Sequence, residues 1–286
     1  MGSGSASIEN ASGAARLLRR ADMADLMRLK ESAGWNQTER DWERLLDLEP
    51  EGCYGIERDG VIVASATAVT YGRDLAWIGM VLTLPEHRGH GYARRLMECT
   101  MEFCARRGVA VVGLDATDMG RPLYEKFGFV EAGVIERWER TAGVGIVAAV
   151  SGIEPWTLDA ALDRAAFGAD RSALLQSLAS AGAGAIPGEG FAMARPGTKA
   201  AYFGPCVART PAAARRLLHW FLLRHAGEAA FWDILAENHA AVALAEEHGF
   251  RRVRKLTRML CASGDSDKAW RPDSDLTYAI CGFAYG

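Results

Sequence analysis

A glycine-containing turn between an apolar strand and a helix is the feature of this sequence with the clearest chemical meaning. Apolar residues run up to Leu84, and Gly89 and Gly91 precede an amphipathic stretch that begins at Tyr92. Glycines leave the amides at a helix N-terminus unobstructed, so unpaired N–H groups and the positive end of the helix dipole converge on one point. Three arginines add positive charge: Arg88, Arg94 and Arg95. The turn therefore predicts an anion site that would hold a pyrophosphate.

Two other phosphate-binding turns fit this stretch poorly. The dinucleotide-binding pattern needs a third glycine within a strand–helix–strand unit. The Walker loop needs Gly-Lys followed by Ser or Thr, which is absent here. A plain strand–helix turn that uses glycine for tightness is the alternative that the spacing alone leaves open.

The composition narrows the class of protein. The chain has 286 residues, which favours two domains, and 33 Lys+Arg against 36 Asp+Glu leave a net charge of −3. This charge gives no support to binding of nucleic acid or an anionic membrane. The charge-free, apolar-leaning run over residues 141–153 is too short to cross a bilayer. No export signal opens the sequence, so we expect a cytoplasmic protein. The six cysteines show no metal-ligand spacing, so we expect reduced thiols and no metal.

Hydrophobic periodicity predicts the elements that position the turn. In the first half we expect helices over 21–34 and from Thr38, whose partner Asp41 would complete a capping box. The further elements expected there are strands over 53–58, 61–71 and 75–84, a helix over 92–107, a strand over 109–116, a short helix over 121–127 and a strand over 129–140. The sequence therefore predicts alternating strands and helices around the glycine turn.

The second half repeats this order. We expect helices over 158–167, 171–180, 211–225 and 239–248, a loop over 181–190, and strands over 191–195, 199–208, 229–235, 250–261 and 276–285. Residues 92–97 parallel residues 213–218, and residues 124–129 parallel residues 245–250, each pair being 121 residues apart. We therefore expect a flexible tail over 1–14 and two domains, over 15–146 and 147–286.

The glycine turn and a later segment together resemble a known fingerprint. Arg88, Gly91 and Ala93 follow an apolar strand, and Leu123-Tyr124 then precede Gly128-Phe129. This pattern resembles the acetyl-CoA fingerprint of GNAT-type N-acetyltransferases. The resemblance extends over both halves to bacterial tandem-GNAT proteins, through residues 34–38, 168–171 and 204–208. It implies an α/β (α+β) fold with two GNAT-like domains, each a mixed twisted sheet flanked by helices.

The resemblance implies a binding site for acetyl-CoA as co-substrate. The amides from Gly89 to Arg94 would bind the pyrophosphate, and the edge of a splayed strand would pair with the pantetheine arm. Thr117 stands where the family often places an Asn that contacts CoA. The cofactor-binding residues implied are Val81, Leu82, Thr83, Arg88, Gly89, His90, Gly91, Tyr92, Ala93, Arg94 and Thr117.

The second half departs from the fingerprint. Its turn, residues 209–214, has no glycine and carries Pro211, which removes one N–H group. Ala245 stands at the position of Tyr124, whereas Asn238 keeps the Asn that Thr117 replaces. We therefore expect a degenerate domain that keeps the fold without the CoA chemistry.

Acetyl transfer from a thioester to an amine needs a proton for the leaving thiolate and donors for the developing oxyanion. By resemblance Tyr124 is the catalytic acid, and the alternative is a core aromatic residue. Strand amides over 81–83 would supply the oxyanion donors. Relatives often place a carboxylate base where this chain has Trp77. Three carboxylates lie near in sequence, namely Glu31, Asp74 and Asp115, but solvated or structural roles fit them better, so we name no base.

The loop between the first two helices overhangs the acceptor site in this fold. We therefore expect Trp35, Asn36 and Gln37 to bind substrate, although a helix cap and core indoles are an equal alternative. The expected function is acetyl transfer to a primary amine of a small molecule, by direct attack in a ternary complex, in a monomer or homodimer. A protein lysine or N-terminal acetyltransferase and a non-catalytic acyl-CoA-binding regulatory module are the alternatives.

Overall fold

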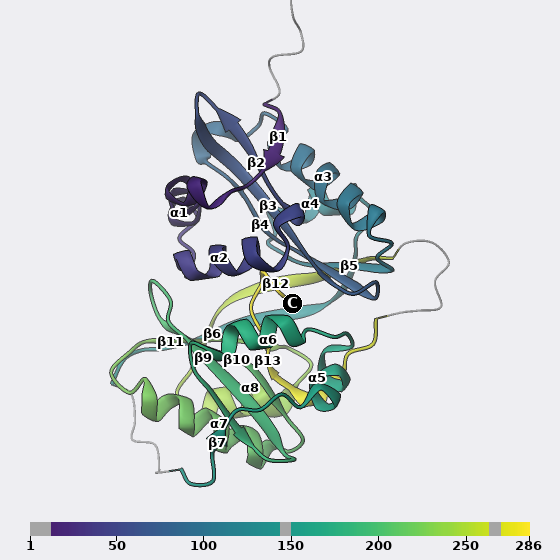
Figure 1. Ribbon diagram of the computed structural model, residues 1–286. Coiled ribbons are helices and arrows are strands. Elements are labelled where there is room, and N and C mark those ends of the chain that lie inside the picture. Colours follow the sequence, from purple (N-terminus) through teal and green to yellow (C-terminus); the bar gives the residue numbers. More distant parts are fainter. Residues whose placement is uncertain (1–12, 144–149, 263–269) are drawn as a thin grey trace, which may run out of the picture.

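One mixed sheet runs through the molecule and takes strands from both halves of the chain (Figure 1). The structure is a computed structural model that describes residues 13–143, 150–262 and 270–286. Within these ranges thirteen strands form the sheet: twelve follow the order β1-β2-β3-β4-β5-β12-β6-β11-β10-β9-β8-β7, and β13 pairs with β10. The expected boundary at 146/147 and nearly all of the expected tail, 1–14, lie outside the described residues.

The first half follows the predicted order of elements closely. It consists of β1 (Ala15–Leu17), α1 (Met23–Ser32), α2 (Glu39–Leu48), β2 (Cys53–Arg58), β3 (Val61–Tyr71), β4 (Leu75–Thr83), α3 (Tyr92–Arg106), β5 (Val111–Ala116), α4 (Arg121–Glu125) and β6 (Val130–Arg140). The predicted capping box at the start of α2 is present, with the Thr38 N–H donating to the Asp41 carboxylate at 2.9 Å. Strand β1 has too short an apolar pattern to be predicted.

The second half holds two departures from the prediction. It consists of β7 (Glu154–Pro155), α5 (Ala160–Phe167), α6 (Ser172–Ala179), β8 (Ala183–Ile186), β9 (Gly190–Arg195), β10 (Ala201–Ala208), α7 (Pro211–Arg224), β11 (Ala230–Leu235), α8 (His239–Glu247), β12 (Arg251–Ala262) and β13 (Thr277–Ala279). The expected loop over 181–190 contains strand β8, whose small residues fit under bulky neighbours: a Cβ on Gly184 would lie 2.7 Å from Ile153. The expected strand over 276–285 is wrong beyond Ala279, because the chain there leaves the second half and crosses to the first.

One long strand of each half inserts into the other half. Strand β12 lies between β5 and β6, and β6 lies between β12 and β11, all antiparallel. We call β6 and β12 the exchanged strands. Each carries an arginine that pairs with an aspartate of the other half: Arg137 of β6 with Asp233, and Arg258 of β12 with Asp115. The halves are therefore joined through the middle of the sheet as well as by the chain.

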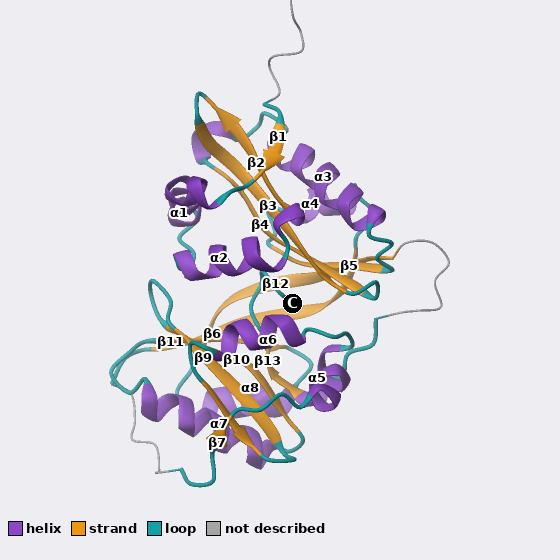
Figure 2. Cartoon of the chain, viewed as in Figure 1, coloured by secondary structure: helices purple, strands orange, loops and turns teal. Residues whose placement is uncertain are grey.

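Helices cover both faces of the first half of the sheet (Figure 2). Successive residues of a strand face opposite sides. Trp77 of β4 belongs to the cluster that contains Leu26 of α1 and Leu45 of α2, whereas Ile78 belongs to the cluster that contains Met97 of α3. We call these the Trp77 face and the Ile78 face. In the described ranges, no helix has both the length and the apolar character that crossing a membrane requires.

Candidate active site

Strands β4 and β5 part from each other halfway along β4. They pair in parallel at three positions, from Leu75 with Val111 to Trp77 with Gly113. Beyond that point β5 stays with β12, which pairs with it over its full length, Val111–Ala116. The edge of β4 from Ile78 to Thr83 therefore has no strand against it among the described residues. Val81, Leu82 and Thr83, at which the resemblance implies a splayed strand edge, lie on this edge. Their pairing with a pantetheine arm stays a prediction.

A bulge distorts β4 at the point of divergence. Met80 has a φ of +51°, which a residue with a side chain rarely adopts outside functional sites. The register with β3 shifts across it, because Thr67 pairs with Gly79 but Ser65 pairs with Leu82. The Ser65 hydroxyl donates to the Met80 carbonyl at 2.8 Å, and the Thr67 hydroxyl to the Gly79 carbonyl at 3.1 Å. These bonds satisfy the two carbonyl oxygens at the bulge and stabilise the bend of the strand there.

A cavity of about 420 Å³ occupies the divergence. Nine of the predicted site residues line it: Trp35, Gln37, Val81, Leu82, Thr83, Arg88, Ala93, Thr117 and Tyr124. The cavity also takes lining residues from the exchanged strands and from the C-terminal segment, Phe283 and Ala284, which the sequence did not indicate. The structure therefore brings part of the expected site together in one cavity that the second half completes. The expected residues outside its lining are Asn36, Gly89, His90, Gly91, Tyr92 and Arg94.

The N-terminus of α3 is open. Its N-cap is Gly91, with a φ of +78°, and no side chain caps the helix. Gly89 has a φ of +81°, and a Cβ added to either glycine would meet nothing within 4 Å. The side chain of Tyr92 is buried, with the His90 ring stacked on it at 5.6 Å. The expected contribution of this turn is therefore from backbone amides, because no side chain caps the helix and the space beside both glycines is open.

Tyr124 projects from α4 into the cavity. Only 8% of its surface is exposed, and its ring lies edge-on to Phe129 at 6.3 Å. Burial raises the pKa of the Tyr124 hydroxyl to about 12, so it stays protonated in neutral solution. Among the described residues no hydrogen bond holds this hydroxyl. It is therefore a proton donor without a partner inside the cavity.

The carboxylate that lines the cavity is already paired. The side chain of Asp115 is fully buried and accepts from Arg258 at 2.9 and 3.1 Å, and the guanidinium lies over the Trp77 ring at 4.4 Å. Burial raises the pKa of Asp115, and the arginine opposes this rise. Glu31 and Asp74 are exposed and lie outside the cavity lining. The structural role expected for Asp115 thus agrees with its bidentate pair.

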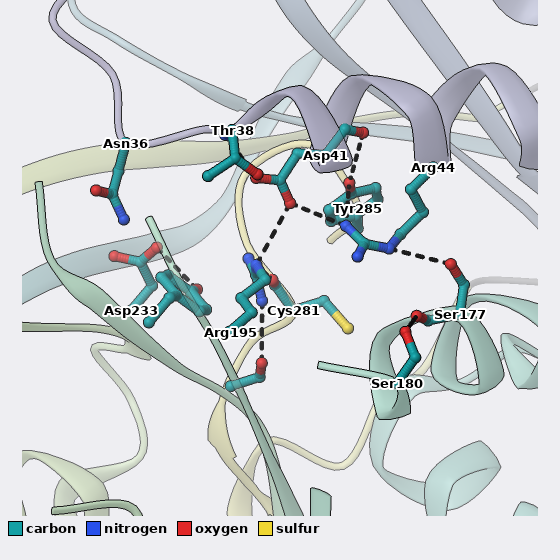
Figure 3. A network of polar contacts seen from close by, with 12 residues as sticks. Asn36, Thr38, Asp41, Arg44, Ser177, Ser180, Arg195, Asp233, Cys281 and Tyr285 are labelled. Carbon is teal, nitrogen blue, oxygen red and sulfur yellow. Dashed lines mark hydrogen bonds and ion pairs between the residues drawn. The ribbon is translucent and has the colours of Figure 1, made fainter. Parts of the chain in front are cut away.

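Asn36 departs from the expectation for the acceptor residues. Its side-chain oxygen accepts from the amides of Lys199 and Ala200 at 2.9 and 3.1 Å, and its nitrogen donates to the Ala200 carbonyl at 3.0 Å. Figure 3 shows it beside a polar network between the halves, in which Asp41 lies between Arg44 and Arg195. Asn36 therefore joins the halves and does not line the large cavity.

The corresponding gap in the second half is filled by the chain itself. Strands β10 and β11 pair from Ala201 to Phe203, and β13 then takes the place beside β10 at Cys206 and Val207. Two side chains hold β13: the Trp232 Nε1 donates to the Tyr278 carbonyl at 2.7 Å, and the Asn238 Nδ2 to the Thr277 carbonyl at 3.1 Å. The sequence analysis did not foresee this filling.

The helix that follows this gap is capped. The Thr210 hydroxyl accepts from the Ala213 amide at 3.1 Å, and Pro211 has no N–H group to offer. The helix start that is open to a ligand in the first half, at α3, is thus capped by the protein itself in the second half, at α7.

Comparisons with known proteins agree with these two halves. The family model "Acetyltransferase (GNAT) family" matches residues 20–129, and "Acetyltransferase (GNAT) domain" matches residues 160–270. The chain is 28% identical over 227 residues to the uncharacterized N-acetyltransferase YitH of Bacillus subtilis, covering 70% of this chain and 75% of YitH.

Two solved structures share the fold. A putative acetyltransferase from Pyrococcus horikoshii aligns with a TM-score of 0.84 at 22% identity, covering 100% of this chain and 99% of its own. A tandem GNAT protein from the clavulanic acid biosynthesis pathway aligns with a TM-score of 0.62 at 14% identity, covering 89% and 99%. At these identities the likeness concerns the fold alone.

Proposed function

Because the chain belongs to the GNAT acetyltransferase family, with two such domains in tandem, we propose that it is an acetyl-CoA-dependent N-acetyltransferase acting on a primary amine of a small molecule. One observation carries this proposal: the open divergence of β4 and β5 places Tyr124, the free edge of β4 and the uncapped start of α3 on one cavity. The first half would perform the chemistry.

The residues present fit acetyl-CoA, which supplies the activated acetyl thioester. The amides from Gly89 to Arg94 would hold the pyrophosphate, since the space before them is open and no side chain caps the helix. The edge of β4 over 81–83 would pair with the amides of the pantetheine arm. Thr117, at the cavity wall, would stand in for the Asn that the family often uses.

The proposed transfer has four steps, and particular residues of the cavity take part in them. The neutral amine attacks the thioester carbonyl carbon, and N–H groups near Val81 stabilise the developing oxyanion. The C–S bond breaks, and Tyr124 donates its hydroxyl proton to the departing sulfur and then regains a proton from solvent. The nitrogen loses its extra proton to water, because the lining carboxylate, Asp115, is held by Arg258. Direct attack in a ternary complex fits a cavity whose described lining has no cysteine to carry the acetyl group.

The walls of the cavity favour a small acceptor over a protein. Strand β12 of the second half and Phe283 of the C-terminal segment stand on the side where the amine would enter. A volume of about 420 Å³ is in the range of small-molecule sites. A peptide chain would need an open groove along this side instead.

The test is release of free thiol from acetyl-CoA in the presence of amines and peptides. We expect release with a subset of small amines. Release with peptides alone would favour a protein acetyltransferase, and tight acetyl-CoA binding without release from any acceptor would favour a binding module. Titration of coenzyme A without measurable heat would overturn the proposal.

A further inference from the structure

A row of charged side chains crosses the exchanged strands and ends in the cavity. In the sheet register Asp233 of β11 lies opposite Arg137 of β6, and Arg137 lies opposite Arg254 of β12. Like charges directly opposite each other across two strands destabilise a sheet. The row therefore contains two adjacent positive charges and one negative charge.

Only one of these two arginines is neutralised. Arg137 makes a bidentate pair with Asp233, at 2.8 and 2.7 Å, and the Tyr202 hydroxyl donates to the same carboxylate at 2.9 Å. Arg254 is half-buried and has no hydrogen bond or ion pair with any described residue. Two other arginines of β12 are paired, Arg252 with Glu136 and Arg258 with Asp115. Arg254 thus brings an uncompensated charge to the cavity that it lines.

The internal symmetry of the sheet shows that Arg254 is an addition. The exchanged strands are related about the pairing of Ile135 with Leu256, so that Arg137 corresponds to Arg258. Arg137 lies opposite Arg254, and Arg258 lies opposite Gly133. The position equivalent to Arg254 is therefore a glycine. The extra guanidinium stands only on the side of the open cavity, and the symmetric framework of the sheet does not require it.

Arg254 lies on the opposite face of the sheet from α3. Arg258 stacks over Trp77, so its side chain is on the Trp77 face, and Arg254, four residues earlier on the same strand, shares that face. Met259, the next residue, belongs instead to the cluster that contains Tyr124 and Met97 of α3. The charge of Arg254 is therefore separate from the open N-terminus of α3, where the diphosphate would bind.

We propose that the acceptor amine carries a carboxylate and that Arg254 binds it; this rests on the proposed function. A guanidinium presents two parallel N–H groups that match a carboxylate. The lining of the cavity also includes the apolar residues Trp35, Leu256 and Phe283. Burial and the charge of Arg137 lower the pKa of Arg254, and the charge of Asp233 opposes this only in part. A bound anion would favour the charged guanidinium further. The inferred acceptors are amino acids or amino acid derivatives with an apolar part.

The experiment compares acceptors that differ only in charge. Phenylalanine, its carboxamide and phenethylamine, with β- and γ-amino acid counterparts, are assayed with wild-type protein, Arg254→Gln, Arg254→Lys and Arg252→Gln. We expect wild type to favour the acids by tenfold or more in kcat/KM. Arg254→Gln should raise the KM of the acids at least tenfold without changing the KM of acetyl-CoA, and Arg254→Lys should restore part of the loss. Arg252→Gln, outside the cavity, is the matched control and should behave as wild type.

Several outcomes would overturn the inference. Equal rates with acid and carboxamide, or a preference for acids that survives Arg254→Gln, would do so. Faster acetylation of aminoalkyl phosphonates than of the carboxylates would replace the carboxylate by a phosphate-like group. If no amine is acetylated, the proposed function fails separately, and binding then decides: N-acetylphenylalanine should bind wild type and not Arg254→Gln, whereas equal binding of acid and amide would overturn the anion site.

Discussion

The gap between β4 and β5 and the gap between β10 and β11 begin alike and end differently. In each, two parallel strands pair at three positions and then separate. The first gap is a cavity with a proton donor in it, and the second holds β13. The same strand geometry thus provides a place for a ligand in one half and for the protein's own backbone in the other.

A few side chains account for this difference. Thr117 and Asn238 both accept from the amide three residues on, but Asn238 also has an NH2 group, which donates to the segment leading into β13. Leu114, next to Asp115, corresponds to Trp232, next to Asp233, and only the indole has a donor for the Tyr278 carbonyl. The comparison teaches that chemistry in this fold depends on polar groups left without an internal partner.

The largest effect that tests this difference between the halves should come from removing the proton donor of the first half. We expect Tyr124→Phe to lower kcat about 10²–10⁴-fold, the usual contribution of a positioned acid, with little change in acetyl-CoA affinity. Steady-state rates and calorimetric titration of acetyl-CoA measure both. Tyr54→Phe, outside the cavity, is the control. An unchanged kcat would leave Tyr124 no more catalytic than Ala245, its counterpart.

The second prediction concerns the ion pair that the second half supplies to the first. Arg258→Met should leave the fully buried Asp115 carboxylate without its partner and lower the free energy of unfolding by about 3–5 kcal/mol. Urea unfolding measures this loss. Arg252→Met, an exposed arginine on the same strand, should leave the unfolding midpoint nearly unchanged. If both variants unfold alike, the pair does not join the halves as the structure indicates.

Asn238→Ala tests what holds β13 in the second gap. Removing the buried amide leaves carbonyls of Ser274 and Thr277 unsatisfied, so we expect a loss of about 1–3 kcal/mol in the free energy of unfolding. Asn238→Asp keeps the oxygen that caps α8 and loses only the donor, which separates the two roles. The KM of acetyl-CoA should not change in either variant. A raised KM would show that the second gap takes part in cofactor binding.

The smallest effects should come from single substitutions at the starts of α7 and α3. Thr210→Ala removes the cap of α7 and should cost about 1 kcal/mol of stability, with no effect on acetyl-CoA binding. Gly91→Ala places a Cβ at a φ of +78° and should cost a similar amount while raising the KM of acetyl-CoA. Thermal unfolding and steady-state kinetics measure the pair. If the KM responds to Thr210→Ala and not to Gly91→Ala, the two turns have been assigned the wrong way round.

The sequence predicted most of what is local. The glycine turn, the capping box of Thr38 and the periodic helices were found because their signals lie within a few residues of each other. Asn36 was misjudged because its partners lie more than 160 residues away. Arg254 was not singled out at all, since nothing near it on β12 shows that it would face Arg137. The surroundings of both residues depend on contacts between segments that lie far apart in the sequence. Composition and local spacing do not predict such contacts.

The order of the sheet also constrains how the molecule is made. Strand β12, at residues 251–262, must enter between two strands that end by residue 140. A chain emerging from the ribosome therefore exposes the facing edges of β5 and β6 until almost all of it has been synthesised. Distant pairing of this kind is slow to form. We expect that the nascent first half stays incomplete, and in need of protection from aggregation, until the second half arrives.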